Sequence, residues 1–184
     1  DHPVEPKGGT LQSLIYQIQP YELALKDTIR IGIRYNRQIK DMPNTSLYYY
    51  NQKSGWTFLP TINLPNRLIM SSTLLSFDAI GIIQDTDPPF VRRVYPANGG
   101  KFHYKDVRTI SVIADDYLSG ISSDEQTMSM KLDGEPVRYA FQPLKKELYY
   151  YLPTPLNAGE HTLEYLLSDQ AGNQVSGSTT FTVD

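Results

Sequence analysis

The chain has 184 residues and a formal net charge of −3, with 40% hydrophobic and 20% charged residues. This ordinary globular balance excludes gross disorder, and the mild acidity gives no electrostatic reason to expect a nucleic-acid partner. The chain contains no cysteine, which excludes disulfides, thiol nucleophiles and thiolate metal sites. It has no apolar run of about 18 residues, so we expect no membrane insertion.

The chain starts at Asp1, without a charged-then-apolar leader. We therefore expect it to be a piece of a longer polypeptide. The rest of that polypeptide would be one of its interaction partners, and any export signal would lie upstream. The 13 prolines, 12 glycines and 14 tyrosines favour β structure with many turns.

A stretch near the middle of the chain predicts a boundary between two domains. Pro88 and Pro89 fix φ and remove two backbone donors, so neither a central strand nor a helix runs through them. Asp87 is pushed into an extended conformation by the proline that follows it. The sequence therefore predicts a stiff interdomain joint formed by Asp85, Asp87, Pro88 and Pro89, which would set the angle between the domains.

Residues 1–9 are polar and rich in proline and glycine, and we interpret them as an N-terminal arm or linker. Residues 10–87 are predicted to form a β-sandwich domain of about six strands. Its clearest alternation places Ile29, Ile31, Ile33 and Tyr35 on one face of a strand. The other strands are predicted over residues 10–19, 47–51, 56–59, 67–72 and 76–83.

The segments Pro20–Leu23, Leu47–Tyr50, Gly55–Thr61 and Ser76–Ile80 together resemble a β-sandwich module of exported bacterial proteins. Such modules stand beside Ig-like repeats and C-terminal to enzymes such as lysostaphin-type zinc endopeptidases. The resemblance implies an accessory role, and any zinc ligands of a parent peptidase would lie outside these residues.

Residues 88–184 are predicted to form a second β-sandwich, with a type I′ hairpin turn at Asp133-Gly134. Pro136 indicates a sheet edge just after that turn. Seven strands are predicted over residues 90–95, 109–114, 128–132, 137–141, 148–152, 163–167 and 180–183.

The turns of this half resemble those of a bacterial Ig-like or fibronectin-type repeat. They are Asp115–Ile121, Asp133–Val137, Gly159–Leu163 and Ser168–Asn173. The fold class is therefore predicted as all-β, with two tandem antiparallel Ig-like sandwiches. This fold hosts many functions, so function has to be argued from specific sites.

The residue pattern does not predict an enzyme. The three histidines are His2, His103 and His161, and no paired metal-binding histidines, nucleophile elbow or phosphate-binding loop occurs. The enzymatic alternative would need a cleft in which carboxylates converge, such as those of Asp115, Asp116 and Glu125.

No cofactor is predicted apart from a candidate calcium site. In an Ig-type tracing, the strand ends bring Asp87, Asp115, Asp116 and Asp169, together with Asp85, to one pole of the second domain. Calcium requires several carboxylate and carbonyl oxygens at once. The alternative is that these aspartates cap local backbone amides in turns.

Exposed aromatic rings would provide sugar-stacking surfaces. Each of two Tyr-Tyr-Tyr runs must turn one face to a core, which leaves Tyr49, Tyr149 and Tyr151 as candidates, with Trp56 across a hairpin. We expect the exposed rings to be scattered rather than gathered in a patch.

The function predicted from the sequence is a non-catalytic spacer, scaffold or adhesion-type module of a larger exported bacterial protein. The alternative is a carbohydrate- or cell-wall-binding accessory module of a secreted or surface enzyme. In either case we expect an extracytoplasmic location (periplasm, cell surface or secreted) and a partner that is another surface protein or a glycan.

Overall fold

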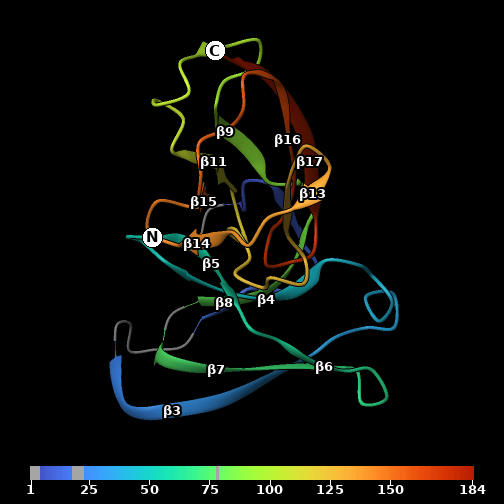
Figure 1. Cartoon of the computed structure of the whole chain (residues 1–184). Helices are drawn as coiled ribbons and strands as arrows, with labels where there is room; N and C mark the ends of the chain where they lie inside the picture. Colours follow the sequence, from blue (N-terminus) through green and yellow to red (C-terminus); the bar gives the residue numbers. More distant parts are fainter. Residues whose placement is uncertain (1–4, 18–22, 78) are drawn as a thin grey trace. The chain divides into compact units, whose positions relative to one another are not determined.

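The computed structural model describes residues 5–17, 23–77 and 79–184, and every regular element in these ranges is a β-strand (Figure 1). The described part accordingly holds no helix that could cross a membrane. The chain divides into a first unit, Asp1–Asp87 with Tyr117–Ser119, and a second unit, Pro88–Asp116 with Gly120–Asp184. Each unit contains two sheets that enclose a core, which confirms the predicted all-β sandwich fold.

The first unit has two sheets. Sheet A has the order β1-β8-β4-β5, with β2 also paired to β8, and sheet B has the order β3-β7-β6. The strands are β1 (Gly9–Leu11), β2 (Tyr16–Gln17), β3 (Leu23–Arg34), β4 (Thr45–Asn51), β5 (Gly55–Leu59), β6 (Ile62–Leu64), β7 (Ile69–Phe77) and β8 (Ala79–Asp85).

The alternation predicted in β3 is present. Ile33 and Tyr35 are buried, whereas Arg30, Gly32 and Arg34 are exposed. Ile33 joins a core cluster between the sheets, which on the side of sheet A includes Leu47, Leu59, Ile80 and Ile82 and on the side of sheet B includes Met70 and Leu74. Antiparallel strands with one buried face produce this period-two pattern.

Sheet A is also covered on its second face. Tyr48 and Ile83 point to that face and form a separate buried cluster with Leu118, against which Leu11, Trp56 and Phe58 pack. Leu118 is only 7% exposed. A Cβ atom at Gly9 would lie 2.4 Å from Leu118 Cδ2, so a residue without a side chain is needed where the two segments meet.

Two strand predictions in this unit are wrong in detail. The strand predicted over 10–19 is interrupted between β1 and β2, and residues 18 and 19 lie outside the described part of the chain. At the interruption the Ser13 hydroxyl, rather than a backbone carbonyl, accepts the hydrogen bond from Ile82 N at 2.9 Å. The break predicted between residues 72 and 76 is absent, and β7 runs through it. Ser71 and Ser72 donate their hydroxyls to Ile31 O and Pro60 O, so these polar residues are satisfied within the sheet.

The second unit also has two sheets. Sheet C has the order β14-β15-β11-β9, and sheet D has the order β10-β17-β16-β12-β13. The strands are β9 (Phe90–Tyr95), β10 (Lys101–Phe102), β11 (Thr109–Asp115), β12 (Ser129–Leu132), β13 (Glu135–Pro136), β14 (Ala140–Gln142), β15 (Glu147–Tyr151), β16 (Gly159–Ser168) and β17 (Gln174–Val183).

The core of this unit lies between sheets C and D. Ile110, Val112 and Leu148 contribute from sheet C, and Leu163 and Phe181 from sheet D, all at no more than 1% exposure. The predicted hairpin turn is confirmed, since Asp133 and Gly134 have φ values of 54° and 82°, as a type I′ turn requires.

The strand predicted over 137–141 is mostly absent, since residues 137–139 belong to no strand and form the connection between β13 and β14. β13 pairs with β12 in sheet D, whereas β14 pairs with β15 in sheet C. Between them Tyr139 N donates to Val137 O, and the Tyr139 hydroxyl donates to Met128 O at 3.0 Å. These bonds turn the chain from one sheet to the other, which the alternation of apolar residues does not reveal.

Candidate functional site

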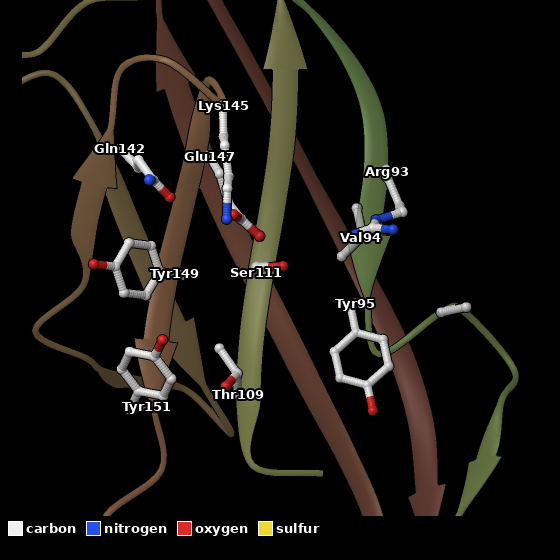
Figure 2. A pocket seen from close by; sticks show the side chains of 11 residues that line it. Arg93, Val94, Tyr95, Thr109, Ser111, Gln142, Lys145, Glu147, Tyr149 and Tyr151 are labelled. Carbon is white, nitrogen blue, oxygen red and sulfur yellow. The ribbon is translucent and has the colours of Figure 1, made fainter. Parts of the chain in front are cut away.

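A groove of about 830 Å³ lies on the face of sheet C that points away from the core of the second unit. Figure 2 shows side chains of β9, β11 and β15 on this face. The lining residues are Arg93, Val94, Tyr95, Ala97, Thr109, Ser111, Gln142, Lys145, Glu147, Tyr149 and Tyr151.

Strand alternation explains why these side chains reach the groove. In β11 and β15, Ile110, Val112 and Leu148 face the core, so the residues between them face outward. The central strand contributes short side chains, and Ser111 is paired on one side with Tyr95 and on the other with Tyr149. The groove therefore has a low floor along β11 and walls on β9 and β15, with wall positions about 10 Å apart at two strand spacings.

One end of the groove is aromatic. The rings of Tyr149 and Tyr151 meet edge to face with centroids 5.3 Å apart, and Tyr151 is 69% exposed. Tyr95 stands on the opposite wall, with Thr109 and Ser111 between the walls (Figure 2). The antiparallel register places three tyrosines around one groove, of which Tyr151 is exposed and Tyr95 and Tyr149 are half-buried. The other exposed tyrosines of the described residues, Tyr16, Tyr104 and Tyr117, lie in other elements, as expected for scattered rings.

The other end of the groove is charged. Arg93 and Glu147 are both paired with Ile113 on the central strand, and Gln142 is paired with Glu147 on the next strand outward. Lys145, in the turn between β14 and β15, completes this end (Figure 2).

Tyr95, Ser111 and Glu147 were not singled out from the sequence, and Arg93 and Lys145 were interpreted only as parts of solvated basic pairs. A bulge between Ile113 and Ala114 shifts the register of β9 against β11. Tyr95 can be assigned to the groove only once that pairing is known, and no local pattern in the sequence indicates it.

The other two predicted aromatic candidates lie in the first unit and are not freely exposed. Tyr49 is half-buried and packs against the core between sheets A and B. Trp56 is also half-buried, with its ring 5.3 Å from that of Tyr50, and it packs against the cluster of Tyr48, Ile83 and Leu118. The prediction of an exposed Tyr49 is wrong because both faces of sheet A are covered.

The aspartates that were predicted to share calcium have different surroundings in the structure. Asp115 is engaged in ion pairs with Lys146 and Arg92. Burial works against its charged form, but the hydrogen bond from Lys146 and the neighbouring cations outweigh burial and lower the pKa of Asp115. Asp87 belongs to the first unit, where it is exposed.

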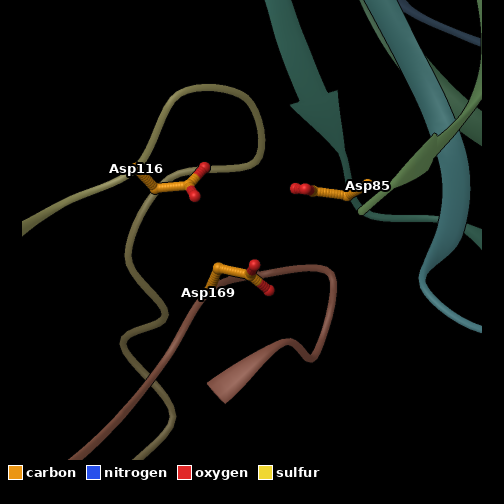
Figure 3. Close-up of side chains that lie close together, drawn as sticks. All are labelled: Asp85, Asp116 and Asp169. Carbon is orange, nitrogen blue, oxygen red and sulfur yellow. The ribbon is translucent and has the colours of Figure 1, made fainter. Parts of the chain in front are cut away.

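Asp116 and Asp169, both of the second unit, each place one carboxylate oxygen within 4.8 Å of the other (Figure 3). Asp85, drawn in the same figure, belongs to the first unit. Asp169 accepts hydrogen bonds from the backbone amides of Gly172 and Asn173 at 2.7 and 2.8 Å, and Asp116 accepts one from Gly120 N at 2.9 Å.

These bonds are the local turn-capping expected of aspartate. Burial, with a smaller contribution from the charge of Asp116, raises the pKa of Asp169. Two carboxylates supply fewer oxygens than the six to eight that calcium takes, so a calcium site stays a prediction.

The residues predicted to form the joint belong to two units, Asp85 and Asp87 to the first and Pro88 and Pro89 to the second. Asp85 ends β8, where its backbone amide donates to Asn44 O at 2.9 Å. Gly8 O accepts hydrogen bonds from the amides of Thr86 and Asp87 at 3.0 and 3.2 Å. This end of the N-terminal arm is therefore hydrogen-bonded to the end of the first unit. Pro88 and Pro89 belong to the second unit and precede β9.

His161 connects two turns of the second unit. Its Nδ1 lies 2.7 Å from Asp133 Oδ2 and its Nε2 lies 2.9 Å from Asn157 O. Burial disfavours the imidazolium, but these two acceptors outweigh burial and raise the pKa of His161. These contacts join the two turns within the second unit.

No protein-family model matches the chain, and no curated protein matches it. Among solved structures, CopC from Methylosinus trichosporium OB3b aligns with 19% identity over 52% of this chain and 93% of its own, at a TM-score of 0.42. PcoC, a methionine-rich copper resistance protein from Escherichia coli, aligns with 17% identity over 53% of this chain and 100% of its own, at 0.43.

Dimeric latent PorU from Porphyromonas gingivalis aligns with 10% identity over 85% of this chain and 20% of its own, at a TM-score of 0.38. These scores are too low to carry an argument about ligand, location or function. The assignment of a binding site therefore depends on the geometry of the groove over sheet C.

Proposed function

We propose that the chain is a non-catalytic accessory module that binds a polysaccharide in the groove over sheet C. The observation that carries this proposal is the gathering of Tyr95, Tyr149 and Tyr151 around one groove with a short polar floor. Sugar rings present apolar C–H faces and hydroxyl edges. Aromatic walls match the faces, and the half-buried Thr109 offers a hydroxyl to the edges.

The shape of the site also supports binding of an extended ligand. The groove follows the central strand β11 and is flanked by β9 and β15 (Figure 2). A sugar chain lying along β11 would contact successive wall residues, because alternate residues of a strand stand about 6.8 Å apart.

The composition of the lining supports binding rather than hydrolysis. Glu147 is the only carboxylate among the residues that line the groove. Most glycoside hydrolases use two carboxyl groups that flank the scissile bond. The proposal therefore retains the non-enzymatic character predicted from the sequence.

The wider assignment is part of the same proposal. A module that binds polysaccharide acts where polysaccharide is found, so we assign it to the periplasm, the cell surface or the secreted fraction, as part of a larger exported bacterial protein. The resemblance of the second unit's turns to bacterial Ig-like repeats supports this assignment. The spacer or scaffold function stays a prediction and is compatible with binding.

Affinity electrophoresis of the whole chain tests the proposal, with a panel of soluble cell-wall and capsular polysaccharides cast into the gels. We expect at least one polysaccharide to retard the chain, and the double variant Tyr149→Ala, Tyr151→Ala to lose the retardation. Tyr104→Ala is the matched control, because Tyr104 is an exposed tyrosine of the second unit outside the groove. Retardation by none of the polymers, or equal loss in the control, would overturn the proposal.

A further inference from the structure

The basic residues at the charged end of the groove differ from their sequence neighbours in whether they make ion pairs within the protein. Two pairs of adjacent basic residues border this side of the second unit, Arg92-Arg93 on β9 and Lys145-Lys146 in the turn before β15. One member of each pair, Arg92 and Lys146, makes an ion pair with Asp115. The other members, Arg93 and Lys145, line the groove.

Within the described part of the chain, the cations in the groove have no carboxylate as an ion-pair partner. Among the described residues, the ion pairs involve Asp115 with Arg92 and Lys146, and His161 with Asp133. Arg93 and Lys145 belong to none of these pairs, and both are exposed. Their charges are therefore available to a ligand.

Local backbone geometry explains why the two members of each basic pair make different contacts. The bulge between Ile113 and Ala114 places both Val91 and Val94 against the core, so the two arginines between them do not alternate as in a regular strand. In the second pair, Lys146 has a φ of 53°. This left-handed residue ends the turn, and Lys145 reaches the groove side (Figure 2).

The charge balance of the groove favours an anionic ligand. Arg93 and Lys145 supply two positive charges, whereas Glu147 supplies one negative charge. The chain as a whole has a net charge of −3, so it does not attract polyanions in general. Affinity for an acidic polymer would therefore have to come from a local site.

We propose that the polysaccharide bound in this groove is acidic, and that Arg93 and Lys145 bind the anionic group of a sugar residue while the tyrosines stack on the adjoining rings. This inference rests on the proposed function and specifies its ligand class. Arg93 provides the planar fork that pairs with carboxylate or sulfate oxygens, and Lys145 provides a mobile point charge. Glu147 reduces the local positive charge, so removing its charge strengthens binding.

The test is affinity electrophoresis of the whole chain in polygalacturonate and in alginate, each compared with its carboxyl-reduced form. Reduction keeps the sugar backbone and converts each carboxylate into a neutral hydroxymethyl group. We expect the acidic form to bind at least about tenfold more tightly than the reduced form, which corresponds to one charge-assisted hydrogen bond. A sulfated galactan in a third gel distinguishes sulfate from carboxylate as the anionic group.

Variants assign the effect to residues. Arg93→Gln and Lys145→Gln should each weaken binding of the acidic polymer by about tenfold and so reduce its preference over the reduced polymer. Glu147→Gln should strengthen binding of the acidic polymer. Arg138→Gln and Lys131→Gln are matched controls, since both residues are exposed in the second unit and neither lines the groove.

Equal binding of acidic and reduced polymers, with loss of both in Tyr149→Ala, would overturn the charge inference and leave the proposed function standing. Binding of none of the polymers would overturn both. Equal weakening by the control substitutions would assign the effect to overall charge and would also overturn the inference.

Discussion

The two units contain the same four-residue sequence, but its tyrosines on the outer face of the sheet differ in burial. Leu47–Tyr50 lies in β4 and Leu148–Tyr151 lies in β15, and both read Leu-Tyr-Tyr-Tyr. In each unit the leucine is fully buried and the second tyrosine of the run, Tyr49 or Tyr150, packs against the core between the sheets. The first and third tyrosines of the run point to the other face of the sheet.

That other face differs completely between the units. Tyr48 is fully buried in the cluster with Ile83 and Leu118, whereas the equivalent Tyr149 lines an open groove. Local sequence and strand alternation are therefore the same, and the difference arises from what covers the sheet. In the first unit, three residues distant in sequence, Tyr117–Ser119, contribute to the cover.

The equivalent tyrosines give the largest predicted difference. Tyr48→Ala should cost about 3–5 kcal/mol of the free energy of unfolding, because it empties a large, fully buried site. Tyr149→Ala should cost less than about 1 kcal/mol, because its ring borders solvent. Urea denaturation of both variants measures this, with Trp56, the chain's one tryptophan, reporting on the first unit and near-UV circular dichroism on the second. Equal losses would contradict the comparison.

A substitution of Leu118 tests the packing on the second face of sheet A. Leu118→Ala should destabilise the first unit by about 2 kcal/mol or more, since it removes a side chain that is only 7% exposed. The transition followed by Trp56 fluorescence should move to lower denaturant, because Trp56 packs against the same cluster. Leu144→Ala is the matched control, at 97% exposure, and should change stability by less than about 0.5 kcal/mol. An unchanged Trp56 transition in Leu118→Ala would exclude this segment from the core of the first unit.

A smaller predicted effect is a dependence of the second unit's stability on pH, which comes from His161. The folded-state pKa of His161 is raised above its ordinary value near 6.5, so its contribution to the second unit is complete below that value. It is lost as pH rises through the raised pKa. We expect at most about 1 kcal/mol, since Asp133 is 46% exposed. Hydrogen exchange of β16 amides, corrected for the intrinsic pH dependence, should show lower protection above the transition, and His161→Gln should abolish the change. A pH response that persists in the variant would assign it to another group.

Much of the fold follows from local patterns in the sequence. Period-two alternation predicts β3, β11, β15 and β16, and the Asp133-Gly134 turn is predicted with its type. Failures occur where backbone bonds or side chains override the pattern. Ser13 interrupts one predicted strand, and the hydrogen bonds of Tyr139 lie in a connection between two sheets where another strand was predicted.

The groove was only half predictable. Tyr149 and Tyr151 follow from alternation alone, because Leu148 must face the core. Tyr95 and Arg93 depend on a bulge and on pairing across β11, which are long-range features. The burial of the face that holds Tyr48 depends on Leu118, about 70 residues away in the chain, and nothing near either residue indicates it.

The central claim is that the open face of sheet C, and not the covered face of sheet A, is where the chain binds its ligand. Mapping of amide chemical shifts by NMR on the whole chain, during titration with a soluble uronic-acid oligosaccharide, tests it most directly. We predict that the shifted amides gather in β9, β11 and β15, around Tyr95, Ser111 and Tyr149. Shifts confined to sheet D or to the first unit, with those three strands unchanged, would contradict the account.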